Sequence, residues 1–329
     1  MRNFLLLMLS ICFFAACGSR NTNGEKYLSE SKGNPYEIVL VAPEQMFKES
    51  ACDTLRSILS QEVEMISRSE PLFDIITTVP SNLKNILLLH RNIIIMESGA
   101  QYDSTSIKVE YNVDSKPQMV VYMSGPNNSE LTNYIGENSK NIVELFNREE
   151  QKRMVAKMTN REAKEVNDTI QSMFGFSAKI PYGYKVRDAQ DGFLWISYET
   201  PATSQGFFIY SYYYDETIKF TQKYAIEMRN KFASLIPGPS DGSYMTTSME
   251  YAPTVKPMVI NGREWVEQRG FWEVENDFMG GPFVSYSTVE RKNNRVIVVD
   301  GYLFSPRNNK PMRNLMRQLE NVVYTIKIE

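Results

Sequence analysis

Residues 258–266, Met-Val-Ile-Asn-Gly-Arg-Glu-Trp-Val, decide the fold of the second half of this chain. Apolar and β-branched residues flank Asn261-Gly262. Such a pair is the strongest short-range sign of a β-hairpin, because both residues accept a positive φ. A further hairpin is predicted about Asn293-Asn294, between strands at 283–289 and 296–303. The second half is therefore predicted to contain an antiparallel sheet.

Helices accompany these strands. Two more strands are predicted at 193–198 and 207–212, and a helix that begins at about Thr217 ends at Pro237. A last helix begins near Pro311 and turns one apolar face inward, formed by Met312, Leu315, Leu319 and Val322. This order predicts an antiparallel sheet with helices packed on it.

Strands and helices alternate in the first half, which predicts an α/β domain. Strands are predicted at 36–41, 92–96, 107–113 and 118–123, with helices at 50–59 and 81–89. The tetrapeptide Ser50-Ala51-Cys52-Asp53 is interpreted as a capping box that starts the first helix. A helical pattern from Ser129 through Met173 is predicted to bridge the two halves.

Length favours two domains over one, because 329 residues exceed what a single hydrophobic core usually serves. We predict an α+β fold with an N-terminal α/β domain at 34–174. A C-terminal antiparallel α+β domain, resembling an α/β/α sandwich, is predicted at 175–329. Residues 18–33 are polar and lack periodicity, and they are predicted to form a flexible tether.

Residues 1–17 have the pattern of a lipoprotein signal peptide. Arg2 precedes an apolar run from Phe4 to Ala16. At about 1.5 Å per residue this run is too short to span about 30 Å of hydrocarbon. Small side chains come directly before Cys17, so cleavage there leaves Cys17 as the lipidated N-terminus.

Composition argues against several classes of function. The formal net charge is −3 and no basic stripe is present, so nucleic acid is not an expected partner. The single histidine, His90, is interpreted as a polar cap at a helix end, and Cys52 as a buried apolar side chain. Residues 279–282, Met-Gly-Gly-Pro, lack the spacing of a phosphate-binding loop and are predicted to form a tight turn. No metal and no cofactor are predicted.

The segment 263–283 concentrates aromatic side chains around one arginine and is the predicted binding surface. Arg269 would bind a carboxylate or phosphate group. The aromatic candidates, which would stack on a ligand or fill a pocket in a partner, are Trp265, Phe271, Trp272 and Phe283. The alternative interpretation is that the aromatic residues alternate into a sheet core and that Arg269 pairs with a surface acid.

Carboxylates in the same segment support a second hypothesis. Glycoside hydrolysis needs a pair of carboxyl groups about 5–9 Å apart. The candidate acid and base residues are Glu267, Glu273 and Asp277. Each has an alternative interpretation as the solvent-facing position of an alternating strand. Two of them facing each other across a cleft would favour a hydrolase of glycan or peptidoglycan.

A set of motifs resembles an uncharacterised family of Bacteroidetes lipoproteins that carries a domain of unknown function. With the lipobox, the motifs are Phe193-Leu194-Trp195, Pro237-Gly238, Gly242-Ser243-Tyr244-Met245, Arg269-Gly270-Phe271-Trp272, Met279-Gly280-Gly281-Pro282-Phe283 and Arg317-Gln318-Leu319-Glu320. The C-terminal layout also resembles the α/β/α sandwich of Mog1- and PsbP-like domains, in Pro181-Tyr182-Gly183-Tyr184, the Asn-Gly hairpin and the terminal helix. The family resemblance implies a Gram-negative cell envelope and supplies no catalytic residues.

The resemblance favours a lipoprotein of the outer membrane that faces the periplasm, since residues 18–23 carry no acidic side chain. The leading hypothesis is a non-enzymatic lipoprotein, held to the membrane by its lipid, that binds a protein or polymeric partner of the envelope. The competing hypotheses are the carboxylate-based hydrolase and a purely structural lipoprotein that supports a larger complex. The sequence leaves open whether catalysis occurs, which partner binds and which oligomer forms.

The lipid anchor gives the first testable prediction. Cells fed an alkyne-tagged fatty acid are expected to label the wild-type chain and not the Cys17→Ser variant, because acylation requires the thiol. The variant is expected to leave the membrane fraction. A wild-type chain without label, or a Cys17→Ser variant that stays in the membrane fraction, would contradict the lipoprotein hypothesis.

Overall fold

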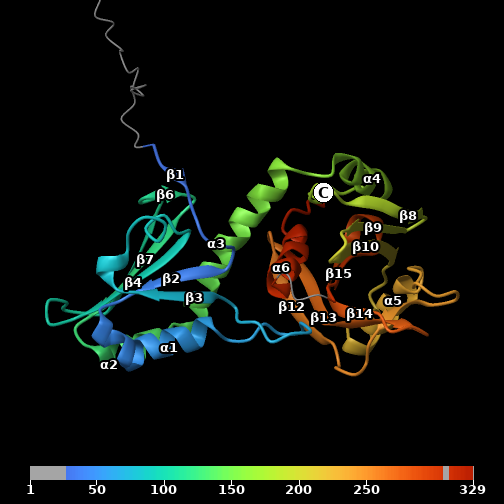
Figure 1. Cartoon of the computed structure of the whole chain (residues 1–329). Helices are drawn as coiled ribbons and strands as arrows, with labels where there is room; N and C mark the ends of the chain where they lie inside the picture. The colour runs from blue at the N-terminus through green and yellow to red at the C-terminus, as the bar shows by residue number, and fades with distance from the viewer. Residues whose placement is uncertain (1–26, 307–310, 329) are drawn as a thin grey trace, which may run out of the picture.

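The structure, a computed structural model, describes residues 27–306 and 311–328 and contains two domains bridged by a long helix (Figure 1). The predicted signal peptide and the predicted lipidation site, Cys17, lie outside the described residues. Each domain has its own sheet and its own buried apolar core. The predicted α+β fold, with an N-terminal α/β part and a C-terminal antiparallel part, is confirmed.

The N-terminal domain is built on a five-stranded mixed sheet. In spatial order its strands are β3 (Asp74–Thr78), β2 (Glu37–Val41), β4 (Asn92–Ser98), β7 (Met119–Gly125) and β5 (Ser106–Tyr111). The first four are parallel, and β5 runs antiparallel to β7. The central strands are continuous apolar runs, as expected of strands covered on both faces. A short pair of strands, β1 (Ser29–Glu30) with β6 (Ser115–Lys116), fastens the start of the described chain to this domain.

Three helices pack on this sheet: α1 (Ser50–Leu59), α2 (Asn128–Glu137) and α3 (Ser139–Asn160). Two short 3₁₀ helices, η1 (Glu44–Lys48) and η2 (Pro80–Asn82), lie in the connections. Leu55, Leu131 and Phe146 bring the three helices into one core with the sheet. Cys52 is fully buried in α1, and this burial raises the pKa of its thiol to about 11. The predicted burial of Cys52 is therefore confirmed.

Two details of the N-terminal prediction are wrong. Ser50 is the first residue of α1 and not its cap, and Glu49 at the N-cap makes no capping hydrogen bond through its side chain. The helix predicted at 81–89 is only η2 followed by turns. Asn85 has a φ of 55°, which a right-handed helix does not contain.

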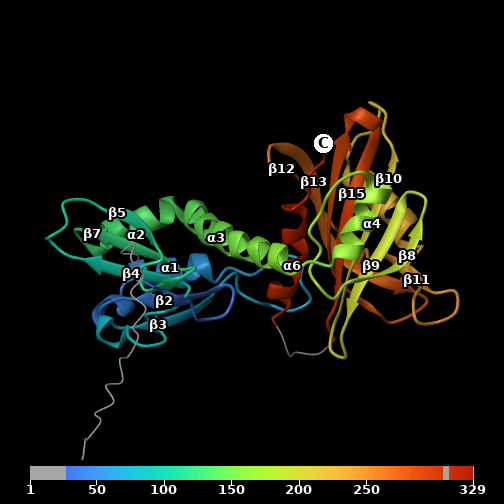
Figure 2. The same ribbon diagram turned by 90° about the horizontal axis from the view of Figure 1, so that it is seen from above.

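The predicted bridge is three helices and not one. The side chain of Asn127 caps α2 by accepting the N–H of Glu130, and α3 begins after Asn138. A third helix, α4 (Lys164–Phe174), ends at Gly175 in the left-handed conformation that favours glycine. Of these three helices, α3 is the one that crosses between the domains. Its end lies against α6 (Met312–Val323), the last helix of the chain (Figure 2).

The C-terminal domain is an eight-stranded antiparallel sheet. The spatial order is β11 (Tyr244–Thr247), β13 (Arg263–Glu275), β14 (Gly280–Glu290), β15 (Arg295–Phe304), β10 (Ser204–Tyr213), β9 (Phe193–Glu199) and β8 (Lys185–Gln190), with β12 (Thr254–Ile260) also paired to β13. A 3₁₀ turn, η3 (Arg291–Asn293), joins β14 to β15. Both predicted hairpins are present, and Asn261 and Gly262 have the positive φ values of 51° and 77° that their turn requires.

Helices cover both faces of this sheet. One face packs against α4 and α6 (Met312–Val323), and the other against α5 (Gln222–Ala233). The tight turn predicted at 279–282 is wrong, because Gly280 and Gly281 lie in β14. They are glycine there because neighbouring strands come very close, and a Cβ on Gly281 would lie 2.1 Å from the carbonyl oxygen of Leu303.

The connection between α1 and β3 reaches from the N-terminal domain to the N-terminus of α6 (Figure 1). The two carboxylate oxygens of Glu70 accept the backbone N–H groups of Met312 and Arg313, each at 2.8 Å. Arg313 donates in return to the carbonyl oxygen of Pro71 at 2.7 Å and to the carboxylate of Asp74 at 2.8 Å. We call these five residues the domain joint.

The joint predicts a stability effect for Glu70→Ala. Free N–H groups at a helix start need acceptors, and loss of two charge-assisted bonds is expected to lower the free energy of unfolding by about 1–3 kcal/mol. Urea unfolding followed by tryptophan fluorescence measures this, because all three tryptophans, Trp195, Trp265 and Trp272, lie in the C-terminal domain. Glu137→Ala, at an exposed position of α2, is the control. Equal midpoints for the two variants would contradict the role of Glu70.

Candidate functional site

An open cleft of about 840 Å³ lies where the N-terminal domain meets the C-terminal sheet. One wall is formed by residues 62–67, which follow α1. The other is formed by the connection between β11 and β12, the end of β13 and the turn into β14. We call it the interdomain cleft, and its lining residues are Glu62, Val63, Glu64, Met65, Ile66, Ser67, Ser248, Glu250, Tyr251, Phe271, Trp272, Glu273, Asp277, Phe278, Met279 and Gly280.

The C-terminal wall follows from how β13 is paired. This long strand pairs with β12 along its first part and with β11 along its last part, so the chain leaves the sheet between the two short strands. The departure begins at Ser248, whose N–H still donates to the carbonyl oxygen of Phe271 at 2.8 Å. The β13–β14 turn is set by Asn276 at a φ of 66° and closed by a bond from Val274 N–H to Met279 oxygen at 2.9 Å.

Exposed aromatic side chains stand in this cleft. Phe278 is 106% exposed and Tyr251 is 58% exposed. Tyr251 also meets the half-buried ring of Phe271 edge-on, with 5.6 Å between ring centroids. Aromatic side chains that are exposed and grouped are typical of surfaces that bind a partner.

The cleft is acidic. Five of its lining residues are carboxylic acids, namely Glu62, Glu64, Glu250, Glu273 and Asp277, and none of these described lining residues is lysine or arginine. At the rim, Lys256 pairs with Glu64 at 2.9 Å. Hydrogen bonds from the Ser240 hydroxyl and the Phe278 N–H lower the pKa of Asp277, which keeps this carboxylate charged at neutral pH.

The structure brings four of the predicted site residues together here: Phe271, Trp272, Glu273 and Asp277. Trp272 contributes little surface, because it is 2% exposed and its indole N–H donates to the carbonyl oxygen of Leu303 at 3.2 Å. Glu273 is exposed and Asp277 is half-buried. The aromatic and the carboxylate candidates therefore meet at one place.

Trp265 and Phe283 do not reach the cleft, and the structure places both in the core. They are 4% and 0% exposed and belong to the two apolar clusters on opposite faces of the C-terminal sheet. Phe283 packs under the guanidinium of Arg229, whose Cζ is 3.6 Å from the ring centroid. For Trp265 and Phe283 the alternative interpretation is therefore correct, since both point from their strands into the core.

Arg269 does not point at a partner either. It donates to both carboxylate oxygens of Glu267, at 2.8 and 2.9 Å, and to Glu320 of α6 at 2.6 Å. Arg317 contacts the same Glu320 at 2.7 Å. Glu267 is thereby held by Arg269 outside the cleft, so it is not available as the acid or base of a hydrolase in the cleft.

Burial alone would raise the pKa of Glu320, but the charges of Arg269 and Arg317 and their hydrogen bonds dominate. They hold this pKa at about 2, against an ordinary value of 4.5. The network joins α6 to β13 and therefore supports the sheet at the back of the cleft.

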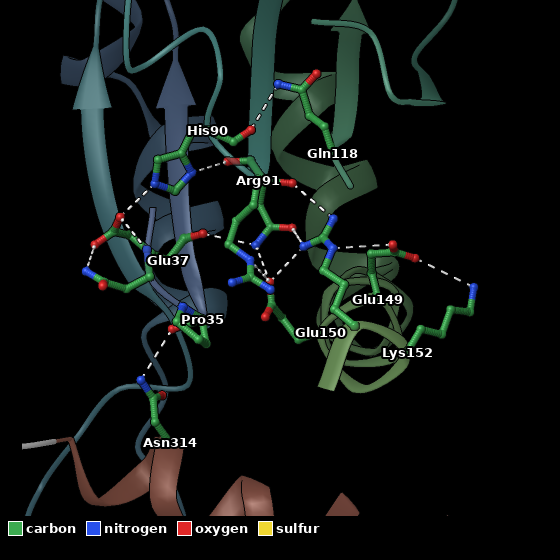
Figure 3. Close-up of polar contacts among 12 residues, drawn as sticks. Pro35, Glu37, His90, Arg91, Gln118, Glu149, Glu150, Lys152 and Asn314 are labelled. Atoms are coloured by element: carbon green, nitrogen blue, oxygen red, sulfur yellow. Dashed lines mark hydrogen bonds and ion pairs between the residues drawn. The ribbon is translucent and has the colours of Figure 1, made fainter. Parts of the chain in front are cut away.

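His90 lies in a different place, in a buried network of the N-terminal domain (Figure 3). Its Nε2 is 2.6 Å from a carboxylate oxygen of Glu37, and its Nδ1 is 3.2 Å from the carbonyl oxygen of Asn92. Gly33 covers the ring so closely that a Cβ there would lie 2.1 Å from Nε2. Both ring nitrogens face acceptors inside the protein, so His90 is not placed to act as a base on a substrate.

The same network fastens α3 to the sheet. Glu150, 1% exposed, accepts from Asn92 at 2.8 Å and from Arg153 at 2.8 Å. Arg91 also lies 3.0 Å from the same carboxylate oxygen of Glu150 (Figure 3). Although partial burial raises the pKa of Glu37, hydrogen bonds from His90 and from Asn34 hold it below its ordinary value.

Several cleft residues were not predicted: the whole N-terminal wall at 62–67, and Glu250, Tyr251 and Phe278. The wall could not be found from the sequence, because its place depends on the domain joint. Phe278 carried a local signal, since an aromatic residue directly after Asn276-Asp277 in a turn has no neighbouring strand to bury it.

Among residues 27–306 and 311–328, no three His, Cys, Asp or Glu side chains are grouped so that they could hold a metal ion. Over the same residues, no helix has the length and apolar character needed to cross a membrane.

Two family models match the chain. Residues 31–159 match a domain of unknown function (DUF8532), and residues 162–325 match another (DUF4837). No curated protein matches. Among solved structures, the chain has a distant resemblance to the Ran-binding protein Mog1p of Saccharomyces cerevisiae, with 10% identity, a TM-score of 0.31, and coverage of 47% of this chain and 92% of that chain. Human StAR-related lipid transfer protein 5 matches with 11% identity, a TM-score of 0.18, and coverage of 53% and 94%.

The low pKa of Glu320 predicts a pH effect on stability. A folded-state pKa of about 2 against 4.5 means that the stabilisation is complete above pH 4.5 and is lost as the pH falls toward 2. The free energy of unfolding of the wild type falls as the pH is lowered from 4.5 to 2. We expect this decrease to be smaller by about 3 kcal/mol in Glu320→Gln, because the variant has no carboxylate to protonate at this position. Urea unfolding at a series of pH values measures this. A variant whose stability falls as steeply as that of the wild type would show that Glu320 is not the titrating group.

Proposed function

We propose that this chain is a non-enzymatic binding protein of the cell envelope that holds a protein or polymeric partner in the interdomain cleft. It would be anchored through Cys17 at the outer membrane and face the periplasm, as the pattern of residues 1–23 indicates. The observation that carries the proposal is that the fully exposed ring of Phe278 and the exposed ring of Tyr251 both line a cleft between two domains. An exposed aromatic group in a concave site lowers the free energy of the complex when a partner covers it.

The cleft geometry favours binding over hydrolysis. A glycoside hydrolase needs one carboxyl group that is protonated near neutral pH, and such groups have a raised pKa. Hydrogen bonds lower the pKa of Asp277, and Glu267 is bound to Arg269 away from the cleft. Glu273 and Asp277 share the cleft, which is the observation that keeps the carboxylate hydrolase as the second candidate.

Photo-crosslinking tests the proposal. A photoreactive phenylalanine analogue at position 278 is expected to crosslink an envelope partner in intact cells. The same analogue at Tyr213, which is 71% exposed on β10 and does not line the cleft, is expected not to. The captured partner, once purified, should bind the wild-type chain and bind Phe278→Ala more weakly by a factor of about five or more.

Equal crosslinking from positions 278 and 213, or equal binding to Phe278→Ala, would contradict the cleft as the binding site. Purified chain incubated with peptidoglycan sacculi tests the second candidate. Release of soluble fragments that Glu273→Gln abolishes would replace the binding proposal with hydrolysis.

A further inference from the structure

We infer that the occupant of the interdomain cleft is a cationic segment of polypeptide, rich in lysine and arginine. This inference rests on the proposed function and names the chemistry of its partner.

The charge in the cleft is local. The whole chain is nearly neutral, with a formal net charge of −3 over 329 residues. The cleft nevertheless gathers five carboxylates within sixteen lining residues. Lys256 neutralises one of them, Glu64, from the rim. A concave surface lined by one sign of charge raises the local concentration of opposite charge, so the field selects a cation.

The exposed apolar groups are aromatic rings, which bind cations through their faces. Phe278 and Tyr251 are the exposed rings. The chain uses the same contact in its own interior, where Arg229 lies 3.6 Å from the centroid of Phe283 and 5.5 Å from that of Phe208. Lysine and arginine also carry apolar stems, which can cover ring surface while the charged ends meet carboxylates.

Size and openness favour a segment of chain over a small ion or a folded domain. A volume of about 840 Å³ is at the upper end of what ligand pockets hold, about 300–1,000 Å³. A neutral glycan would gain no electrostatic attraction from the five carboxylates, and an anionic polymer would be repelled by them. A segment rich in lysine and arginine can contact the aromatic rings and pair with the carboxylates at the same time.

Peptide binding tests this inference. The probe is a fluorescein-labelled peptide of twelve residues in which Lys and Arg alternate with Gly and Ser, and the control peptide has Gln in place of each Lys and Arg. Fluorescence anisotropy is expected to show saturable binding of the cationic probe that weakens as salt is raised from 50 to 300 mM, with no binding of the Gln peptide.

Matched variants distinguish binding in the cleft from electrostatic attraction to the chain as a whole. Glu250→Gln with Glu273→Gln is expected to weaken binding about fivefold. The control pair, Glu137→Gln with Glu165→Gln, changes net charge equally at exposed positions outside the cleft and should leave affinity unchanged. Phe278→Ala should weaken binding about threefold, and Tyr213→Ala not at all. All these side chains are exposed, so circular dichroism should report unchanged folding.

Equal loss of binding from both glutamate pairs would overturn the inference, and so would equal binding of the cationic and Gln peptides. Failure of the probe together with a glycan or neutral protein crosslinked at position 278 would also overturn it while leaving the proposed function intact. Failure of the probe with no crosslink at position 278 would remove both.

Discussion

The rest of the structure depends on the contact between Glu70 and the N-terminus of α6. A helix start carries N–H groups without partners inside the helix and a partial positive charge. In this chain a carboxylate from the other domain satisfies two of those N–H groups, and Arg313 from the same helix turn returns to Pro71 and Asp74. Arg313 is 1% exposed, whereas the side chain of Asp74 that it meets is 49% exposed, so the contact lies at the edge of the protein interior. The joint follows residues 62–67 directly in the chain. With the bond from Arg68 to the carbonyl oxygen of Ser305 at 2.6 Å and the Lys256–Glu64 ion pair, it holds this segment against the C-terminal domain.

Buried charges elsewhere in the chain follow one rule: each lies beside an opposite charge and within hydrogen-bonding reach of it. Arg229 and Asp300 are both fully buried and meet at 2.9 Å, and Thr247 accepts a further bond from the arginine. Glu320 lies between Arg269 and Arg317. These networks connect helices to sheets, at α5 in the first case and at α6 in the second. They explain why the arginine predicted to bind a partner serves the fold. The cleft carboxylates differ from these buried charges, because most of them are exposed to solvent, although Glu64 pairs with Lys256 at the rim.

Patterns confined to neighbouring residues predicted much of the fold. The Asn261-Gly262 hairpin and the inward face of α6 follow from local rules of turn chemistry and helical period, and both are present. Breaks were harder to predict, since Asn85 and the residues 161–163 interrupt segments whose apolar spacing is compatible with helices. The glycines at 280–281 are compatible with a turn in the sequence, because the close contact between strands that requires them is visible only in the structure. The site was predicted only on one side. Phe271, Glu273 and Asp277 lie in it, whereas Trp265 and Phe283 alternate into the core, and the opposite wall comes from a segment about 200 residues away in the chain.

We infer that the domain joint holds the wall of the interdomain cleft in place and that the cleft receives a cationic segment. Arg313→Met tests it directly, because Arg313 lies outside the cleft and its loss makes the chain more negative. If simple attraction governed binding, this variant would bind the cationic peptide more tightly. If the joint holds the cleft wall in place, as we conclude, titration calorimetry should show weaker binding despite the added negative charge. Affinity equal to or greater than that of the wild type would contradict the account.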